Sequence, residues 1–123
     1  MATPSIFNKA KLSGAAAGNL GIKVVATATL GTTIHTAVAG ITANTFDEIW
    51  LWAVNSDTTA RKLTLEWGGA TAPDALIEVT IPAESGLFLV APGLILQNSL
   101  VVTAFCATAN VVMIHGYVNE VKP

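Results

Sequence analysis

The chain is a series of short apolar segments rich in Val, Ile, Thr, Leu and Trp, each soon interrupted by Gly, Pro, Asn or Ser. These segments recur at about the 8-to-12-residue spacing that is typical of sandwiches and barrels. No segment keeps an apolar stripe at positions i, i+3, i+4 and i+7 over three turns, so we expect almost no helix. The sequence therefore predicts an all-β protein.

From residue 22 onward the pattern predicts nine strands, separated by residues that adopt a positive φ, fix φ or cap a turn with a side chain. The predicted strands are residues 22–29, 33–39, 47–54, 61–67, 76–81, 86–91, 94–97, 100–106 and 111–119.

Residues 1–21 are rich in Ala, Gly, Ser and Lys, and the run GAAAGNLG at 14–21 has neither strand nor helix periodicity. We expect an extended or flexible N-terminal arm, followed by one β-sandwich domain at 22–123. The glycine spacing matches neither phosphate-binding loop pattern. Ile6 and Phe7 are apolar residues in this arm, and they are candidates for anchoring it on a neighbouring subunit.

The predicted strands differ in how many apolar faces they carry. In 61–67 and 76–81, apolar residues alternate with Lys, Thr and Glu, which predicts one solvated face. In 48–54 both faces are apolar, with Trp50 and Trp52 on one of them. Because a two-sheet sandwich covers only one face of each strand, the second face needs another partner, most simply another subunit.

Composition supports assembly and argues against several other functions. Charged residues make up only 11% of the chain, against about a quarter in average domains. The net charge of −2 and the scattered basic residues exclude a nucleic-acid footprint. The longest apolar stretch, 87–96, is interrupted by Pro92-Gly93 and is shorter than the roughly 20 residues that a membrane span needs.

The chain also lacks the usual signs of export and of metal binding. The N-terminal sequence has no compact apolar block of the secretory type, so we expect synthesis and initial residence in a cytoplasm. Cys106 is the only cysteine and lies in an apolar strand, which predicts a buried, inert thiol and no intrachain disulfide. No Cys and His pairing suggests a metal site, and no cofactor is expected.

We expect no enzymatic activity and no catalytic residue. The eight carboxylates, among them Asp47 and Glu66, fall mostly at strand ends or on alternating polar faces and are predicted to be solvated. Ser85 lacks the preceding glycine of a nucleophile elbow. His35 and His115 are predicted to be hydrogen-bonded structural residues. A small hydrolase with a hidden carboxylate pair, drawn from residues such as Glu66, Glu78 and Glu84, is the third-ranked alternative.

The tryptophans are the best candidates for a contact surface. Trp67 alternates with Leu63 and Leu65, so we expect it in the core. Trp50 and Trp52 share a face and are the better candidates for contact, and packing between the sheets or at a subunit contact is favoured there over stacking on a sugar.

Six segments carry a family resemblance: KLSG at 11–14, IKV at 22–24, GTTIHTA at 31–37, DEIWL at 47–51, LEWG at 65–68 and IHGYVN at 114–119. Together they resemble small virion structural proteins of tailed bacteriophages, of the β-sandwich type that decorates or cements a capsid. The resemblance implies a jelly-roll-like or Greek-key sandwich of about 8–9 short antiparallel strands. It further implies an oligomer, often a trimer, whose N-terminal arm contacts the major capsid protein.

The resulting expectation is a structural protein on the capsid surface of a virion, with itself and the major capsid protein as partners and with no nucleic-acid or membrane partner. A carbohydrate-binding module, or a fibre or tail component of the virion, is the alternative, and it leaves a glycan as a possible partner. The predicted interface residues are Ile6, Phe7, Leu12, Trp50, Trp52 and Phe88.

Overall fold

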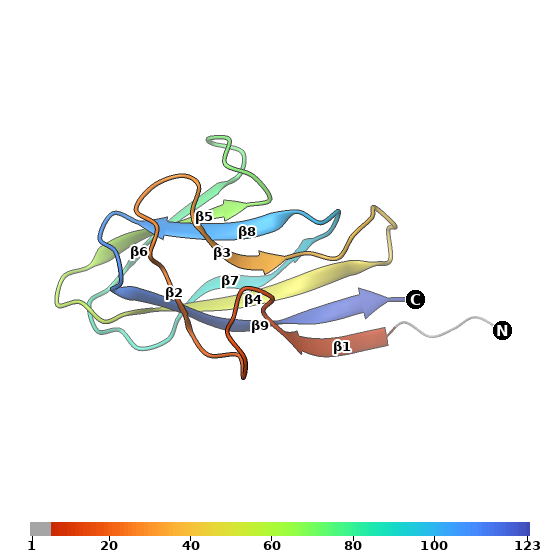
Figure 1. The fold of residues 1–123 in the computed structure, drawn as a ribbon, viewed down its shortest axis with the longest axis horizontal. Coiled ribbons are helices and arrows are strands. Elements are labelled where there is room, and N and C mark those ends of the chain that lie inside the picture. Colours follow the sequence, from red (N-terminus) through yellow and green to blue (C-terminus); the bar gives the residue numbers. More distant parts are fainter. Residues whose placement is uncertain (1–5) are drawn as a thin grey trace.

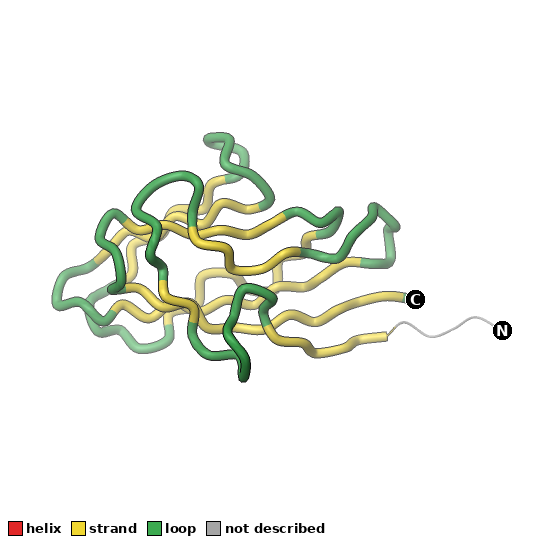
Figure 2. The backbone as a smooth tube through the Cα atoms, in the orientation of Figure 1, coloured by secondary structure: helices red, strands yellow, loops and turns green. Residues whose placement is uncertain are grey.

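The structure, a computed structural model, describes residues 6–123, which form nine strands and no helix (Figure 2). The all-β prediction is confirmed. The strands are β1 (Ile6–Lys11), β2 (Ile22–Lys23), β3 (Thr32–Thr36), β4 (Phe46–Asn55), β5 (Arg61–Trp67), β6 (Leu76–Ile81), β7 (Phe88–Leu96), β8 (Val101–Cys106) and β9 (Val112–Lys122).

The strands form two antiparallel sheets that pack as the layers of a sandwich (Figure 1). The first sheet has the order β1-β9-β4-β7, with β2 also pairing with β9, and the second has the order β3-β8-β5-β6. The pairing is nested, because β5 pairs with β6, β4 with β7, β3 with β8 and β2 with β9. Most consecutive strands therefore lie in different sheets, and the connections cross between the layers.

Between the sheets lies one core of aliphatic side chains. On β4 the buried residues Ile49, Leu51 and Ala53 alternate with the half-exposed Trp50 and Trp52, as the two-faced pattern predicts. The facing sheet contributes chiefly residues of β5 and β8, and Cys106 is buried among them, as expected. The principal core residues are Ile49, Leu51, Leu63, Leu65, Val102, Ala104, Ile114 and Val118.

Part of the predicted N-terminal arm belongs to the sandwich. The strand β1 pairs with the last strand over its whole length, from Ile6 opposite Lys122 to Lys11 opposite Tyr117. Leu12 follows as a core residue with 1% exposure, and such burial contributes about 1.5–3 kcal/mol. Asn19 then ties the following loop down, since its side chain accepts from Leu12 N and donates to Gly116 O. Residues 1–5 of the arm lie outside the described residues.

The predicted strands differ most from the structure in two places. The strand predicted at 22–29 stops at Lys23, because side chains satisfy the backbone beyond it: Thr32 Oγ1 accepts from Val25 N and Ala26 N. The strands predicted at 86–91 and 94–97 are one strand, β7, which absorbs Pro92 through shifts of register against β4. Proline is tolerated there because β7 is an edge strand.

The solvated face predicted for 61–67 is also wrong. Lys62 is exposed, but Thr64 and Glu66 are buried. The loop between β2 and β3 reaches over this side of the sheet, where Thr29 Oγ1 and Gly31 N donate to the Glu66 carboxylate. Thr103 Oγ1 donates to the same group at 2.6 Å. Glu66 therefore fastens this loop to the second sheet.

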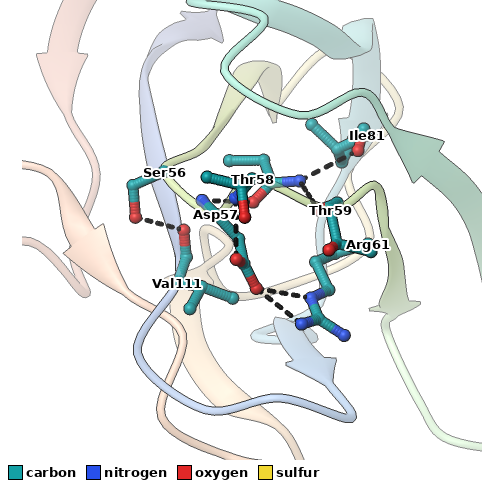
Figure 3. Close-up of polar contacts among 8 residues, drawn as sticks. Ser56, Asp57, Thr58, Thr59, Arg61, Ile81 and Val111 are labelled. Atoms are coloured by element: carbon teal, nitrogen blue, oxygen red, sulfur yellow. Dashed lines mark hydrogen bonds and ion pairs between the residues drawn. The ribbon is translucent and has the colours of Figure 1, made fainter.

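A tight turn carries the chain from β4 in the first sheet to β5 in the second (Figure 3). The buried Asn55 side chain donates to Thr59 O and Ile81 O and accepts from Asp57 N. Arg61 Nε donates to Asp57 Oδ2 at 2.8 Å, and this contact is the main reason that the pKa of Asp57 lies below its ordinary value.

Candidate functional site

The outer faces of the two sheets differ in chemistry. On the second sheet, the strand register and the pleat place mostly polar side chains outward: Lys62, Thr64, Glu66, Glu78, Thr80 and Thr103, with Leu76 and Phe105 as the apolar members. On the first sheet they place mostly apolar side chains outward: Phe46, Trp50, Trp52 and Val54 on β4, and Met113, Tyr117 and Val121 on β9. The outer face of the first sheet is therefore the candidate contact surface.

Three aromatic rings form the centre of this surface. Trp50 lies opposite Tyr117 in the ladder, and Trp52 lies two residues further along β4 on the same side of the sheet. The ring centroids are 6.0–6.5 Å apart, and the planes are inclined to one another by 16–28°. Aromatic pairs at such separations attract one another beyond the area that they bury. We call these three residues, with Lys9, Glu48 and Asn119, the aromatic face.

A row of polar groups borders the rings. Trp50 Nε1 donates to Glu48 Oε1 at 2.7 Å, and Asn119 Nδ2 donates to the same oxygen at 3.0 Å. These two hydrogen bonds lower the pKa of Glu48 below its ordinary value, so the group is a carboxylate at neutral pH. Lys9 Nζ lies 4.2 Å from the centroid of the Tyr117 ring, in cation–π contact.

Two glycines make room for Trp50. A Cβ at Gly93 would lie 2.9 Å from Cζ2 of the indole, and a Cβ at Gly116 would collide with the carbonyl oxygen of Trp50. Larger residues at these positions of β7 and β9 would displace the ring or the strand. The Pro92-Gly93 pair thus lies within β7 and contacts the indole of Trp50, whereas the sequence suggests a turn at this pair.

The predicted interface residues fall into two groups. Trp50 and Trp52 are half-buried on the aromatic face, while Ile6 and Phe7 are 45% and 64% exposed at the start of β1. Leu12 and Phe88 do not lie on this surface: Leu12 is a core residue, and Phe88 is partly buried and packs against the core. Phe88 faces inward since it lies opposite the buried Ala53.

Sequence reasoning missed several members of this surface. Tyr117 joins the tryptophans only because β9 pairs with β4, some 60 residues away in the chain. Leu89, the neighbour of Phe88, lies opposite Trp52 and is 45% exposed, and Ile95 lies opposite Glu48 and is 55% exposed. The alternation of β7 could have suggested these two, but the shifts of register hide which residues point outward.

An apolar hollow of about 460 Å³ adjoins the end of this sheet. Phe46, Ile95 and Leu96 of the first sheet line it, together with Ile41 and Leu100 from neighbouring loops. No carboxylate or histidine lines this hollow, so it offers no acid or base chemistry.

The buried titratable groups lie elsewhere, and two of them contradict the prediction that the carboxylates are solvated. Asp47 is 3% exposed and Glu66 is fully buried. His35 is hydrogen-bonded as predicted, with Nε2 at 2.7 Å from Asp47 Oδ2. Ser13 N donates to its Nδ1, so both ring nitrogens are engaged in hydrogen bonds within the protein. His115 is exposed instead, and its ring lies against Gly21.

Residues 6–123 contain no group of three His, Cys, Asp or Glu side chains placed to hold a metal ion. The same residues include no helix of the length and apolarity needed to cross a membrane. Comparison with protein-family models, with curated proteins and with solved structures gives no match.

Proposed function

We propose that this protein is a structural subunit of a virion, which decorates or cements a phage capsid by docking its aromatic face onto protein neighbours. The observation that best supports this proposal is the contrast between the two outer faces. One is lined with Trp50, Trp52 and Tyr117, and the other chiefly with Thr, Lys and Glu. Large apolar surface patches on soluble proteins are characteristic of interaction sites.

The strand order supports this proposal at the level of the fold. The nested pairing of β2 with β9, β3 with β8, β4 with β7 and β5 with β6 supports the jelly-roll arrangement that we propose from the sequence resemblance. Jelly rolls form many viral capsid domains and also lectin domains. This support is an analogy of fold, and the specific role depends on the contact surface.

The proposal fixes an orientation on the particle. The first sheet faces the neighbours, and the β6 edge of the second sheet, with the exposed Lys62–Glu78 ion pair, faces solvent. The partners on this reading are further copies of the chain and the major capsid protein. Phe7 extends the contact surface along β1, since it lies opposite Val121 at the end of the aromatic face.

The test is assembly itself. The mass of the purified protein is measured by light scattering, and the protein is then mixed with capsid shells from which the native copies have been removed. We expect an oligomer that rebinds to the shells. Trp52→Lys should weaken oligomer formation and rebinding at least tenfold, whereas the matched control Thr80→Lys, on the outer face of the second sheet, should leave both unchanged.

A monomer that has no affinity for such shells would contradict the proposal. Equal losses in Trp52→Lys and Thr80→Lys would contradict the assignment of the first sheet as the docking side. Circular dichroism spectra of both variants establish that each is folded.

Carbohydrate binding is the second candidate, and the polar row beside the rings favours it. Glu48, Asn119 and Lys9 offer hydrogen-bond acceptors and donors next to aromatic rings, a combination that suits a sugar. On this alternative, oligosaccharides change the tryptophan fluorescence of the protein, and Trp50→Ala abolishes the change. The absence of binding across a broad glycan array would eliminate this candidate.

A further inference from the structure

A buried histidine and carboxylate join the two sheets near the N-terminal segment. His35 on β3 and Asp47 on β4 are 4% and 3% exposed, and Nε2 of the ring lies 2.7 Å from Asp47 Oδ2. That oxygen also accepts from Val38 N at 3.2 Å. The other oxygen, Oδ1, is buried and has no hydrogen-bond partner among the described residues. The negative charge of this carboxylate is thus only partly compensated.

The second ring nitrogen of His35 holds the segment that follows β1. Ser13 N donates to Nδ1 at 3.0 Å, and Ser13 Oγ accepts from Thr36 N at 2.7 Å. Gly14 N donates to Ile34 O at 2.9 Å, so three hydrogen bonds fasten residues 13–14 to β3. An amide N–H can only donate, which requires that Nδ1 carries no proton and that Nε2 donates to Asp47.

We propose that His35 is a pH-sensitive latch that holds the Ser13 amide when its ring is neutral and releases this amide when the ring gains a proton. A proton taken from solvent binds to Nδ1, and the ring then donates from both nitrogens. The Ser13 amide loses its acceptor, because two N–H groups cannot hydrogen-bond to each other. The bond from Nε2 to Asp47 becomes an ion pair, which compensates the buried carboxylate.

The groups around His35 allow this change. Asp47 is the titratable group in contact with it, and Glu120 on β9 lies opposite Asp47 in the ladder, so a second carboxylate lies on the same side. The β8 residues opposite this part of β3 are Val101 and Val102, which do not titrate, and residues 12–14 carry no charge.

The segment that His35 holds continues directly from β1, which borders the aromatic face. Lys9, four residues before Ser13, contacts Tyr117, and Lys11 lies opposite Tyr117 in the ladder. The latch itself does not depend on the proposed function, since it rests on contacts within one protomer.

The test is amide hydrogen exchange measured by NMR between pH 8 and pH 5, corrected for the pH dependence of intrinsic exchange. We expect the protection of the Ser13 amide to fall about tenfold at the lower pH, while amides in the centre of β4 remain protected. His35→Gln, whose side chain cannot gain the proton, should abolish this pH response. His115→Gln, which alters the exposed histidine, should retain it.

Imidazole ¹⁵N shifts of the wild-type protein provide a second readout that requires no variant. The latch predicts an unprotonated Nδ1 at pH 8 and protonation of Nδ1 that coincides with the loss of Ser13 protection. Constant Ser13 protection down to pH 5, a ring that never gains the proton in this range, or an unchanged response in a folded His35→Gln protein would each overturn the proposal.

Discussion

At the scale of single residues, the side chains that depart from the sequence pattern are polar groups satisfied by distant partners. Glu66 occupies an outward position of β5, and alternation alone predicts that it is solvated. It is buried because Thr29, Gly31 and Thr103 supply donors from two other segments. Such partners are separated from it by more than 30 residues, so no local pattern reveals them.

Glu66 yields a prediction about stability and pH. Burial raises the pKa of this carboxyl. The hydrogen bonds from Thr103, Gly31 and Thr29 together lower this pKa by more than burial raises it, so the pKa lies below its ordinary value. A lowered pKa in the folded state gives stability that is present above the unfolded-state pKa and is lost as pH falls through the folded-state pKa. Glu66→Gln should cost about 1–3 kcal/mol at pH 7, because an amide NH₂ then faces donors.

The measurement is the free energy of unfolding in urea at pH 7 and at pH 3. The difference between wild type and Glu66→Gln should narrow below about pH 4.3, the ordinary pKa of glutamate, as the wild-type carboxylate becomes protonated. Glu78→Gln, which removes an exposed ion pair with Lys62, is the control and should have little effect at either pH. A Glu66→Gln deficit that is equally large at both pH values would contradict this account.

At the scale of elements, the sequence locates most strands but not their neighbours. The predictions for 47–54, 61–67, 76–81 and 100–106 agree closely with β4, β5, β6 and β8, because period-two alternation and turn residues are local signals. The pairing of β4 with β9 and the bulges in β7 depend on long-range contacts. For that reason the sequence identifies the two tryptophans as surface candidates, but it reveals neither Tyr117 as their neighbour nor the inward orientation of Phe88.

The turn from β4 to β5 provides a prediction at this scale. Asn55 is fully buried, and its side chain donates to two carbonyls and accepts from one amide across the turn. Asn55→Ala leaves these three groups unpaired and should cost about 2–3 kcal/mol in chemical denaturation. Ser56→Ala is a neighbouring control that should cost less than about 0.5 kcal/mol, since its side chain is exposed and its backbone bond to Val111 O persists. Similar losses in both variants would mean that the Asn55 network contributes nothing specific.

At the scale of the whole molecule, the two outer faces of the sandwich differ in chemistry. Charged residues make up only 11% of the chain, and the structure places an apolar outer surface on the first sheet. The sequence could not make this assignment, because it depends on which strands share a sheet. Trp50 and Tyr117 belong to the same surface only through the closing of the sheet by the last strand.

The pairing of Ile6 with Lys122 brings the first described strand and the last strand together, since partners in an antiparallel ladder lie about 5 Å apart. A circular permutant follows from this adjacency: a short Gly-Ser linker joins Lys122 to Ile6, and new ends open between Gly69 and Ala70, in the loop before β6. This permutant should retain nearly the melting temperature of the parent in a thermal scan. A permutant opened between Asp57 and Thr58 should melt well below it, and equal melting of the two would contradict the prediction. Such a re-ordered chain would have both ends at the loop before β6, away from the aromatic face, so that cargo could be fused there and displayed away from the rings.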